Sequence, residues 1–158
     1  MKFKLRPYQE EASKKAVEFF LDDKKNWNAL EVLPTASGKS LILADIAARL
    51  KDKVLVFSPT KEILEQNYKK YCSYGFDNAS IYSASFKSKE ISDVTFATIG
   101  SVKGHPELFT DFKYILIDEV HLVKPESGMY KDFLDKLKSK VIGLTATPFR
   151  LYSYQNYG

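Results

Sequence analysis

The stretch Ala29-Leu30-Glu31-Val32-Leu33-Pro34-Thr35-Ala36-Ser37-Gly38-Lys39-Ser40 decides the fold of this chain. Its apolar first part predicts a strand, and the apolar run 41–50 that follows predicts a helix. Between them, Gly38 allows a tight turn and leaves room for an anion. A strand, a glycine turn and a helix in this order direct backbone N–H groups and the positive helix end toward a phosphate. The segment therefore predicts a phosphate-binding turn.

The two residues that close this turn add nucleotide chemistry. Lys39 can reach the β- and γ-phosphates of a bound nucleotide, and the Ser40 hydroxyl can ligate Mg²⁺. The turn departs from the general G-x-x-x-x-G-K-S/T pattern, because Leu33 takes the first glycine position and Ala36 stands where glycine is common. A lysine in an ordinary surface turn is the alternative. The residues predicted to surround the phosphates are Pro34, Thr35, Ala36, Ser37, Gly38, Lys39 and Ser40.

A second motif, Asp118-Glu119-Val120-His121, follows the apolar run 114–117. We predict that Asp118 holds the Mg²⁺ through water and that Glu119 polarises the attacking water. A solvated acidic pair at a strand end is a common alternative, and only the phosphate turn upstream makes it the weaker one. Together the two motifs predict Mg-ATP chemistry, with Lys39, Asp118 and Glu119 as the catalytic residues.

Apolar strand-like runs alternate with amphipathic helical runs along the whole chain. This alternation predicts an α/β fold with a doubly wound, mainly parallel sheet and helices on both faces. Strands are predicted at 29–33, 54–57, 79–82, 94–98, 114–117 and 141–144, and later helices at 40–50, 64–72 and 129–137. The predicted apolar stripe of the helix at 64–72 is Leu64, Tyr68, Tyr71 and Cys72. Pro7 opens a first helix, whose predicted buried face is Tyr8, Ala12, Ala16, Phe19 and Phe20. The polar segment 83–93 predicts a surface loop or a short irregular helix.

Length and composition limit the class of protein. The 158 residues predict one domain, and 44% hydrophobic with 28% charged residues is typical of a soluble globular chain. No apolar run approaches the roughly 20 residues needed to span a bilayer, and the N-terminus lacks the apolar stretch of a signal peptide. We therefore predict a cytoplasmic or other intracellular location. The net charge of +4 is compatible with a nucleic-acid partner, but it is weak evidence for one. The single cysteine, Cys72, is predicted to be a buried apolar residue.

The motifs also stand in the order of one family. The chain resembles the N-terminal RecA-like domain of superfamily 2 helicases and translocases over nearly its whole length. The matching runs are 6–9 (Arg-Pro-Tyr-Gln, adenine recognition), 34–40 (motif I), 57–66 (motif Ia), 97–102 (a looser motif Ib), 118–121 (a DEVH form of the DEAD/DEAH box) and 144–148 (motif III). The run Gly143 to Arg150, G-L-T-A-T-P-F-R, leans toward the restriction-enzyme, recombination and repair branch.

This resemblance implies roles for single residues. Gln9 would pair with the N6 and N7 edge of adenine, which favours ATP over GTP, and Arg6 would pack on the base. A solvated Gln9 in the first helical turn is the alternative. Contacts with a nucleic-acid backbone are implied for Pro59, Thr60, Lys61, Thr98 and Ser101, with ordinary strand-end capping as the alternative for the last two. Coupling between the two sites is implied for His121, Thr145, Ala146 and Thr147, with a hydrogen-bonded turn as the alternative.

The family hydrolyses ATP between two RecA-like domains, and the second domain supplies arginine fingers from a Q-x-x-G-R-x-x-R motif that this sequence lacks. We therefore predict a first domain at 1–148, the start of a linker at 149–158, and a second RecA-like domain outside this chain; a natural short protein is the alternative. The predicted function is the ATP-binding domain of an ATP-dependent DNA helicase or translocase that uses ATP and Mg²⁺. An RNA helicase, a non-catalytic binding module and a P-loop kinase or transporter ATPase are the alternatives. Motifs Ia and III count against the last.

Overall fold

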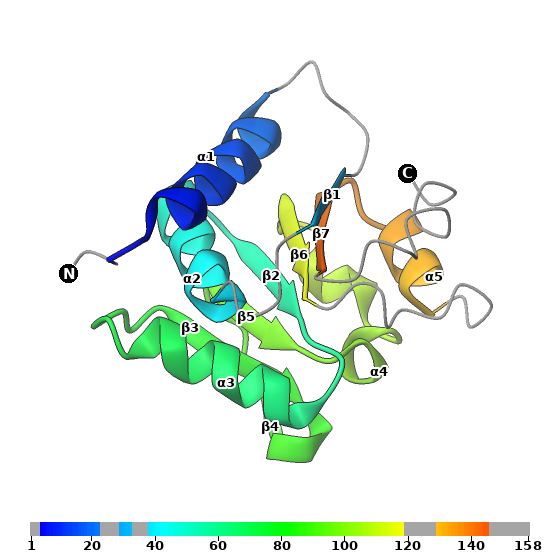
Figure 1. The fold of residues 1–158 in the computed structure, drawn as a ribbon. Helices are drawn as coiled ribbons and strands as arrows, with labels where there is room; N and C mark the ends of the chain where they lie inside the picture. The colour runs from blue at the N-terminus through cyan, green and yellow to red at the C-terminus, as the bar shows by residue number, and fades with distance from the viewer. Residues whose placement is uncertain (1–3, 23–28, 33–37, 119–128, 146–158) are drawn as a thin grey trace.

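The computed structural model describes residues 4–22, 29–32, 38–118 and 129–145, and it shows a sheet covered by helices on both faces (Figure 1). The helices are α1 (Pro7–Leu21), α2 (Lys39–Leu50), α3 (Lys61–Cys72), α4 (Ile99–Val102) and α5 (Met129–Asp135), with 3₁₀ turns η1 (Ala84–Phe86) and η2 (Pro106–Phe109). The strands are β1 (Ala29–Val32), β2 (Val54–Phe57), β3 (Ala79–Ser83), β4 (Ser88–Lys89), β5 (Val94–Ala97), β6 (Tyr114–Ile117) and β7 (Lys140–Thr145). In this part of the chain, no helix is long and apolar enough to cross a membrane.

The described strands form one sheet in the order β1-β7-β6-β2-β5-β3-β4. Every neighbouring pair is parallel except β3 and β4, which are antiparallel. The predicted α/β class is therefore confirmed, and each predicted strand lies within two residues of an observed one. The short edge strand β4 was not predicted, because two residues carry no readable alternation.

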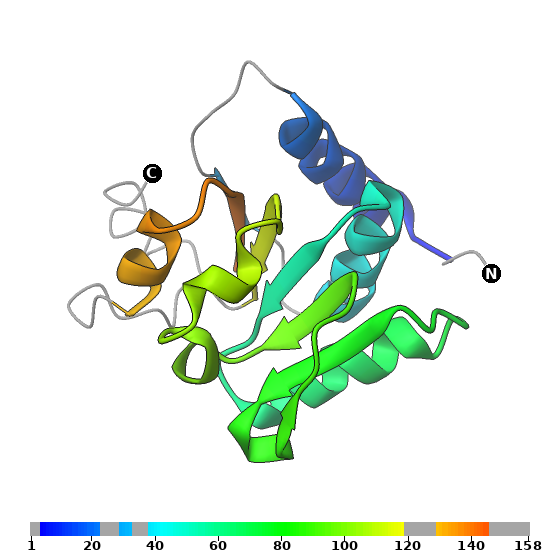
Figure 2. The ribbon, with the colours of Figure 1, turned by 180° about the vertical axis from the view of Figure 1, so that it is seen from behind.

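The central strands feed two hydrophobic cores, one on each face of the sheet. Val54 and Val56 of β2 pack under α1, α2 and α3, whereas Leu55 and Phe57 pack under α4, η2 and α5. All four side chains are fully buried. A continuous apolar run is what a parallel strand covered on both faces requires. The two helix layers appear in turn in the front and rear views (Figures 1 and 2).

The buried face of α1 differs from the prediction at its first residue. Tyr8 is 40% exposed, whereas Gln9 is only 6% exposed and lies on the buried side with Ala12 and Ala16. The helix begins at Pro7, and the Gln9 side chain folds back so that its Oε1 accepts a hydrogen bond of 2.8 Å from the N–H of Arg6. A polar residue thus takes the position that hydrophobic periodicity assigned to Tyr8.

A buried polar cluster fixes α1 against α2. Ser13, which is fully buried, donates a hydrogen bond to Asp45, and the Nε of Arg49 donates to the same carboxylate oxygen at 2.6 Å. Arg49 also lies 3.8 Å from Glu10, back on α1. Because buried polar side chains are costly unless they are hydrogen-bonded, these contacts favour one arrangement of the two helices. That arrangement places the start of α1 beside the start of α2.

Candidate nucleotide-binding site

The site lies at the carboxyl edge of the sheet. The parallel register pairs Phe57 of β2 with Ile117 of β6, so the next residues, Ser58 and Asp118, come side by side. The backbone N–H of Asp118 donates to the carbonyl of Phe57 at 2.9 Å, which continues the ladder by one step. In open α/β sheets, ligands bind outside this edge of the strands.

Helix α2 begins at the same edge with Gly38 as its N-cap. Gly38 has a left-handed backbone (φ 76°, ψ 47°), and its carbonyl accepts hydrogen bonds from the N–H groups of Leu41 and Ile42 at 3.0 and 3.1 Å. A Cβ at this position would collide with the amide nitrogen of Gln9. The left-handed backbone therefore favours glycine, and any larger residue would have to displace the end of the Gln9 side chain. The first turn of α2 directs its N–H groups outward, as a phosphate site needs.

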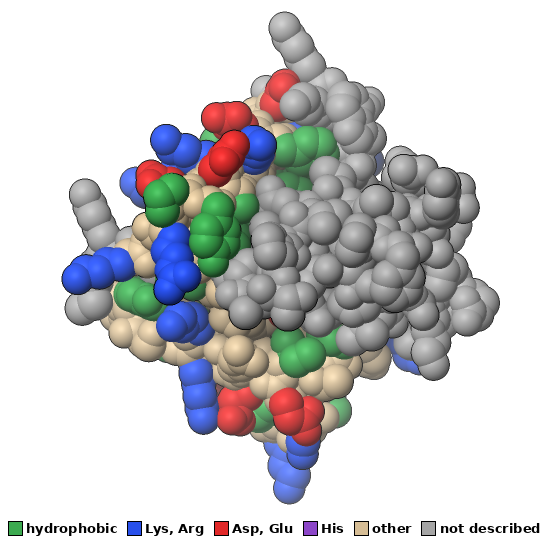
Figure 3. Space-filling model, in the orientation of Figure 1, with side chains coloured by type: hydrophobic (Ala, Val, Ile, Leu, Met, Phe, Trp, Pro, Cys, Tyr) green, Lys and Arg blue, Asp and Glu red, His purple; other side chains and the backbone are tan. Residues whose placement is uncertain are grey.

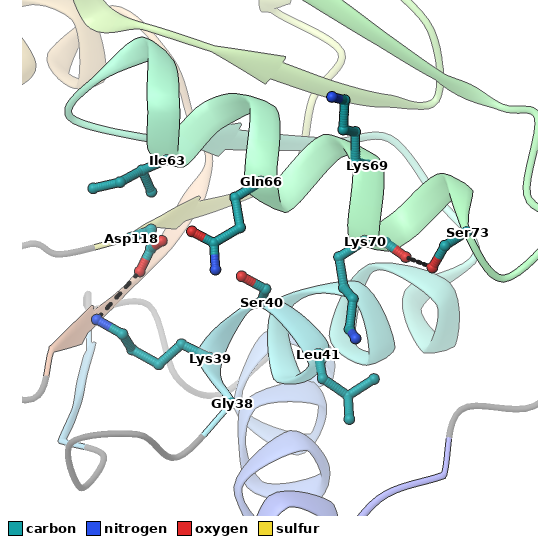
Figure 4. Close-up of a pocket in the computed structure, with 10 residues that line it drawn as sticks. All are labelled: Gly38, Lys39, Ser40, Leu41, Ile63, Gln66, Lys69, Lys70, Ser73 and Asp118. Carbon is teal, nitrogen blue, oxygen red and sulfur yellow. Dashed lines mark hydrogen bonds and ion pairs between the residues drawn. The ribbon is translucent and has the colours of Figure 1, made fainter.

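The predicted residues Lys39, Ser40 and Asp118 come together at this helix start (Figure 4). The Nζ of Lys39 lies 3.7 Å from Oδ1 of Asp118, and the Asp118 side chain is only 4% exposed. This carboxylate lies close to the lysine that is predicted to reach the phosphates. The cationic and anionic halves of the predicted site, which lie 79 positions apart in the sequence, are thus in direct contact.

Asn67, a residue that the sequence analysis did not select, joins these groups. Its Oδ1 accepts a hydrogen bond of 2.8 Å from Ser40, and its Nδ2 donates to Asp118 at 2.9 Å and to Ser58 at 3.1 Å. The side chain is almost fully buried. Asn67 falls three residues after Leu64 and four before Tyr71, and all three are the buried residues of α3. A polar residue at a buried helical position was the signal that could have identified it.

The apolar stripe of α3 is accordingly corrected. The sequence predicted Leu64, Tyr68, Tyr71 and Cys72, but Tyr68 and Cys72 are only partly buried. Cys72 is thus not the fully buried apolar residue that was expected. The pKa of the Tyr68 phenol is raised, mainly by burial and to a smaller extent by a hydrogen bond with Cys72.

A cavity of about 970 Å³ opens beside the helix start, between α2 and α3. Its lining residues are Gly38, Lys39, Ser40, Leu41, Ile63, Gln66, Lys69, Lys70, Ser73 and Asp118 (Figure 4). Three of these residues are lysines, and basic side chains run down the edge of the molecule on the side of α2 and α3 (Figure 3). Positive charge and a helix start in one cavity suit an anionic ligand.

Of the two residues predicted to recognise adenine, Gln9 lies against Gly38, which follows Ser37 of the predicted phosphate turn and precedes α2. Gln9 is buried against Gly38, and its carboxamide oxygen accepts the N–H of Arg6, as described above. Arg6 is the exposed N-cap of α1. The structure therefore brings the predicted adenine and phosphate contacts together. Their roles toward a bound base stay predictions.

The residues predicted to contact nucleic acid form two groups. In the first, Thr60 is the N-cap of α3, and its hydroxyl accepts a hydrogen bond of 3.2 Å from the N–H of Ile63. Its sequence neighbours are half-buried Pro59 and exposed Lys61. In the second, the hydroxyls of Thr98 and Ser101 lie 3.0 Å apart, and Ser101 accepts the N–H of Ala84 at 3.0 Å. The side chain of Thr98 forms no helix-capping bond, and its hydroxyl also lies 3.3 Å from that of Ser83.

Several predicted residues fall outside the described part of the chain. These are Pro34, Thr35, Ala36 and Ser37 of the turn, Glu119 and His121 of the acidic motif, and Ala146 and Thr147. The backbone of Thr145 ends β7, where it pairs with Val32, the last residue of β1. The first two residues of motif III thus lie beside β1, the strand that precedes the phosphate turn in the sequence.

The donor set suits Mg²⁺ bound together with a nucleotide. The described residues contain no group of three His, Cys, Asp or Glu side chains placed to hold a metal ion by themselves. Mg²⁺ usually takes one or two protein oxygens, with phosphates and water completing its shell. The Ser40 hydroxyl and the Asp118 carboxylate, each hydrogen-bonded to the same Asn67 amide, are oxygen donors of this kind. The residues present therefore fit the ion.

Comparison with known proteins assigns the family. The family described as "Type III restriction enzyme, res subunit" matches residues 2–150. The chain belongs to this family. It is also 31% identical over 152 residues to the DNA 3'-5' translocase XPB2 of Sulfurisphaera tokodaii, which covers 94% of the chain and 32% of that protein. It is 32% identical over 167 residues to the ATP-dependent DNA helicase Hel308 of Methanocaldococcus jannaschii, which covers 90% of the chain and 14% of that protein.

Solved structures of helicases share the fold. The UvsW helicase of bacteriophage T4 matches with a TM-score of 0.74 and 23% identity, over 96% of this chain and 58% of that one. The SWI2/SNF2 ATPase core of Sulfolobus solfataricus in complex with dsDNA matches with a TM-score of 0.73 and 23% identity, over 98% and 35%. The resemblance to the N-terminal domain of superfamily 2 helicases is therefore confirmed for family and fold. The chain spans less than a third of the length of XPB2 and of Hel308.

Proposed function

We propose that this chain is the ATP-binding, first RecA-like domain of an ATP-dependent DNA helicase or translocase. The observation that carries the proposal is the convergence of Gly38, Lys39, Ser40 and Asp118 on one cavity at the carboxyl edge of the sheet. Family membership and the names of the relatives support it.

The chemistry follows from the groups in the cavity. Lys39 would neutralise charge on the β- and γ-phosphates, while Ser40 and Asp118 would hold Mg²⁺, which supplies further charge neutralisation when bound. Glu119 would orient the attacking water. Because Lys39 contacts Asp118, arriving phosphates would compete with that carboxylate for the ammonium group. Phosphoryl transfer at such a site is mostly positioning and electrostatics, so each of these side chains should matter for turnover.

DNA is the favoured polynucleotide. XPB2 and Hel308 are by name DNA enzymes, and the SWI2/SNF2 core was solved with dsDNA. RNA is the second candidate, because a protein of African swine fever virus whose name designates it an ATP-dependent RNA helicase is 33% identical over 73% of the chain. We assign the backbone contacts to Pro59, Thr60 and Lys61 at the start of α3, and to Thr98 and Ser101. We also place the chain, by its G-L-T-A-T-P-F-R run, in the restriction, recombination and repair branch with a DEVH box.

The proposal includes a second RecA-like domain that supplies arginine fingers. The chain has only three arginines, Arg6, Arg49 and Arg150, and none stands in a Q-x-x-G-R-x-x-R motif. An arginine finger raises turnover by roughly 10³–10⁵ where it has been measured in phosphoryl transfer. We therefore expect this chain alone to bind Mg-ATP and to hydrolyse it very slowly.

The test measures binding and turnover separately. Binding of a fluorescent ATP analogue is titrated with and without Mg²⁺, for the wild-type chain and for Lys39→Ala. Lys14→Ala is the matched control, because Lys14 is an exposed lysine of α1 outside the cavity. We expect Lys39→Ala alone to lose affinity. Equal affinity in all three chains would refute the phosphate role of Lys39.

Turnover is then followed with single- and double-stranded DNA and RNA. Stimulation by DNA supports the first candidate, and stimulation by RNA alone supports the second. In the complete protein, Glu119→Gln should abolish turnover while ATP binding persists; unchanged turnover would remove Glu119 from the mechanism. ATP binding with no turnover in the complete protein would indicate a non-catalytic binding module instead.

A further inference from the structure

The buried amide of Asn67 sits between Ser40 and Asp118, the two residues predicted to hold magnesium, and it lies outside every motif of the sequence analysis. We propose that Asn67 is a positioning residue that sets the Ser40 hydroxyl and the Asp118 carboxylate in the arrangement that Mg²⁺ needs. This inference rests on the proposed function of the site, because it concerns how that site holds its metal ion.

The chemistry of the neighbours fixes the orientation of the amide. An ionised carboxylate only accepts hydrogen bonds, so the group 2.9 Å from Asp118 must be the NH₂ of Asn67. The carboxamide oxygen then faces Ser40, which must donate its one hydrogen at 2.8 Å. The second N–H goes to Ser58 at 3.1 Å. The carboxylate therefore specifies the orientation, and the two hydroxyls, which can donate or accept, fit it. The amide cannot rotate without losing bonds in a buried place.

This orientation prepares Ser40 to bind a cation. A hydroxyl has one hydrogen and two lone pairs, and a metal ion needs a lone pair. By accepting the hydrogen, Asn67 turns it away from the cavity and leaves the lone pairs of Ser40 as acceptors. A serine without this partner would rotate, and its hydrogen could point at the metal position.

The same amide sets the angle of the acidic ligand. Asn67 donates a hydrogen bond to Oδ2 of Asp118, while Nζ of Lys39 lies 3.7 Å from Oδ1. The carboxylate thus accepts a hydrogen bond from α3 at one oxygen and has a cationic group of α2 near the other. Groups that orient metal ligands in this way are often nearly as important as the ligands, and their loss typically weakens metal binding 10–100-fold.

The bond to Ser58 anchors this arrangement to the sheet. Ser58 follows β2, its N–H donates to Ala97 at 3.1 Å, and its side chain is almost fully buried. Asn67 is therefore fixed on the far side from the cavity by a residue that has no predicted contact with nucleotide. A rigid support on one side and two metal ligands on the other are the features of a positioning group.

The experiment titrates Mg²⁺ at a fixed concentration of fluorescent ATP analogue and measures the Mg²⁺ concentration at half-maximal binding. For Asn67→Ala, we expect this concentration to rise about 10–100-fold, while Mg²⁺-free affinity for the analogue stays within about twofold of wild type. Asn78→Ala is the matched control: Asn78 accepts a hydrogen bond of 2.8 Å from the hydroxyl of Tyr71, outside the residues that line the cavity. It should leave the Mg²⁺ requirement unchanged.

A second variant tests the inference if Asn67→Ala does not fold. Asn67→Gln keeps every donor and acceptor but moves the amide by one methylene, so it should still raise the Mg²⁺ requirement in a folded chain. A Mg²⁺ requirement within twofold of wild type in a folded Asn67 variant overturns the inference and leaves the proposed function standing. No Mg²⁺-dependent binding by the wild-type chain overturns the proposed function itself.

Discussion

Replacing Gly38 with alanine tests whether Gln9 packs against the phosphate turn as the structure shows. Two effects add in this variant. An alanine with φ near +76° takes on the left-handed penalty of roughly 1–2 kcal/mol. Its Cβ also displaces the Gln9 amide, and the hydrogen bond from Arg6 to Gln9 contributes about 0.5–1.5 kcal/mol.

The expected loss in the free energy of unfolding is therefore about 1.5–3.5 kcal/mol, the sum of these two ranges. For a domain of this length, that loss lowers Tm by roughly 3–14 °C. Domains of this kind have a total stability of about 5–15 kcal/mol, so the variant should remain folded. Urea unfolding followed by circular dichroism measures the change directly, and the m-value checks that the unfolded reference is the same.

Gly75→Ala is the matched control. Gly75 also has a left-handed backbone (φ 90°), but nothing lies within 4 Å of the Cβ it would gain. It should lose only the conformational part, and the difference between the two variants isolates the Gln9 contact. In the double variant of Gln9→Ala and Gly38→Ala, the hydrogen bond between Arg6 and Gln9 can be lost only once. The loss of stability in the double variant should therefore be smaller than the sum of the two single losses by about 0.5–1.5 kcal/mol. A Gly38→Ala chain no less stable than Gly75→Ala, with additive losses in the double variant, would refute the contact.

Three further predictions concern the frame around the site. Asp45→Ala removes the acceptor shared by buried Ser13 and by Arg49, and urea unfolding should show a free energy of unfolding lower by about 1–3 kcal/mol. The control Glu11→Ala breaks an exposed ion pair with Lys15 and should change the free energy of unfolding by less than about 0.5 kcal/mol. Thr60→Ala removes the N-cap of α3 and should lower the same quantity by about 1 kcal/mol, with recovery in Thr60→Ser; equal stability of all three chains would contradict the cap. Burial raises the pKa of the Tyr71 phenol, so the folded state favours the neutral phenol. The stability that results from this pKa difference is present below the unfolded pKa of about 10. It is lost as the pH rises through the folded pKa. Stability should therefore fall above about pH 10 and fall less in Tyr71→Phe; parallel pH profiles of the two chains would contradict this assignment.

The sequence predicted the elements of this fold well, because each strand is a short apolar run and each long helix has its own period. Apolar runs such as 54–57 and 114–117 were placed to the residue. The motifs likewise predicted that Lys39 and Asp118 share a site, since strands of a parallel sheet end at a common edge. These features are local, or they follow from topology alone.

The sequence did not reveal the polar contacts that join the helices. Gln9, Ser13 and Asn67 each stand among apolar neighbours on a buried helix face, and periodicity alone assigns such positions to hydrophobic residues. The hydrogen-bond partners of Ser13 and Asn67 lie on other elements, whereas Gln9 bonds to Arg6 of its own helix and packs against Gly38 of α2. Only the three-dimensional packing of α1, α2 and α3 shows that each polar residue has a partner. Tyr8 was misplaced for the same reason.

These missed contacts surround the start of α2 from both sides. On one side, the end of the Gln9 side chain of α1 packs against Gly38; on the other, Asn67 of α3 accepts a hydrogen bond from the hydroxyl of Ser40. Any displacement of the turn between these residues must therefore disturb the first residues of α1, the middle of α3, or both. The predicted adenine contacts lie at the first of these places, and Thr60 and Lys61 begin the helix that carries the second. The helix start that is predicted to bind phosphate is thus in contact with α1 and α3, which carry the predicted adenine contacts and one of the two groups of predicted nucleic-acid contacts. This arrangement rests on side chains that are both polar and buried.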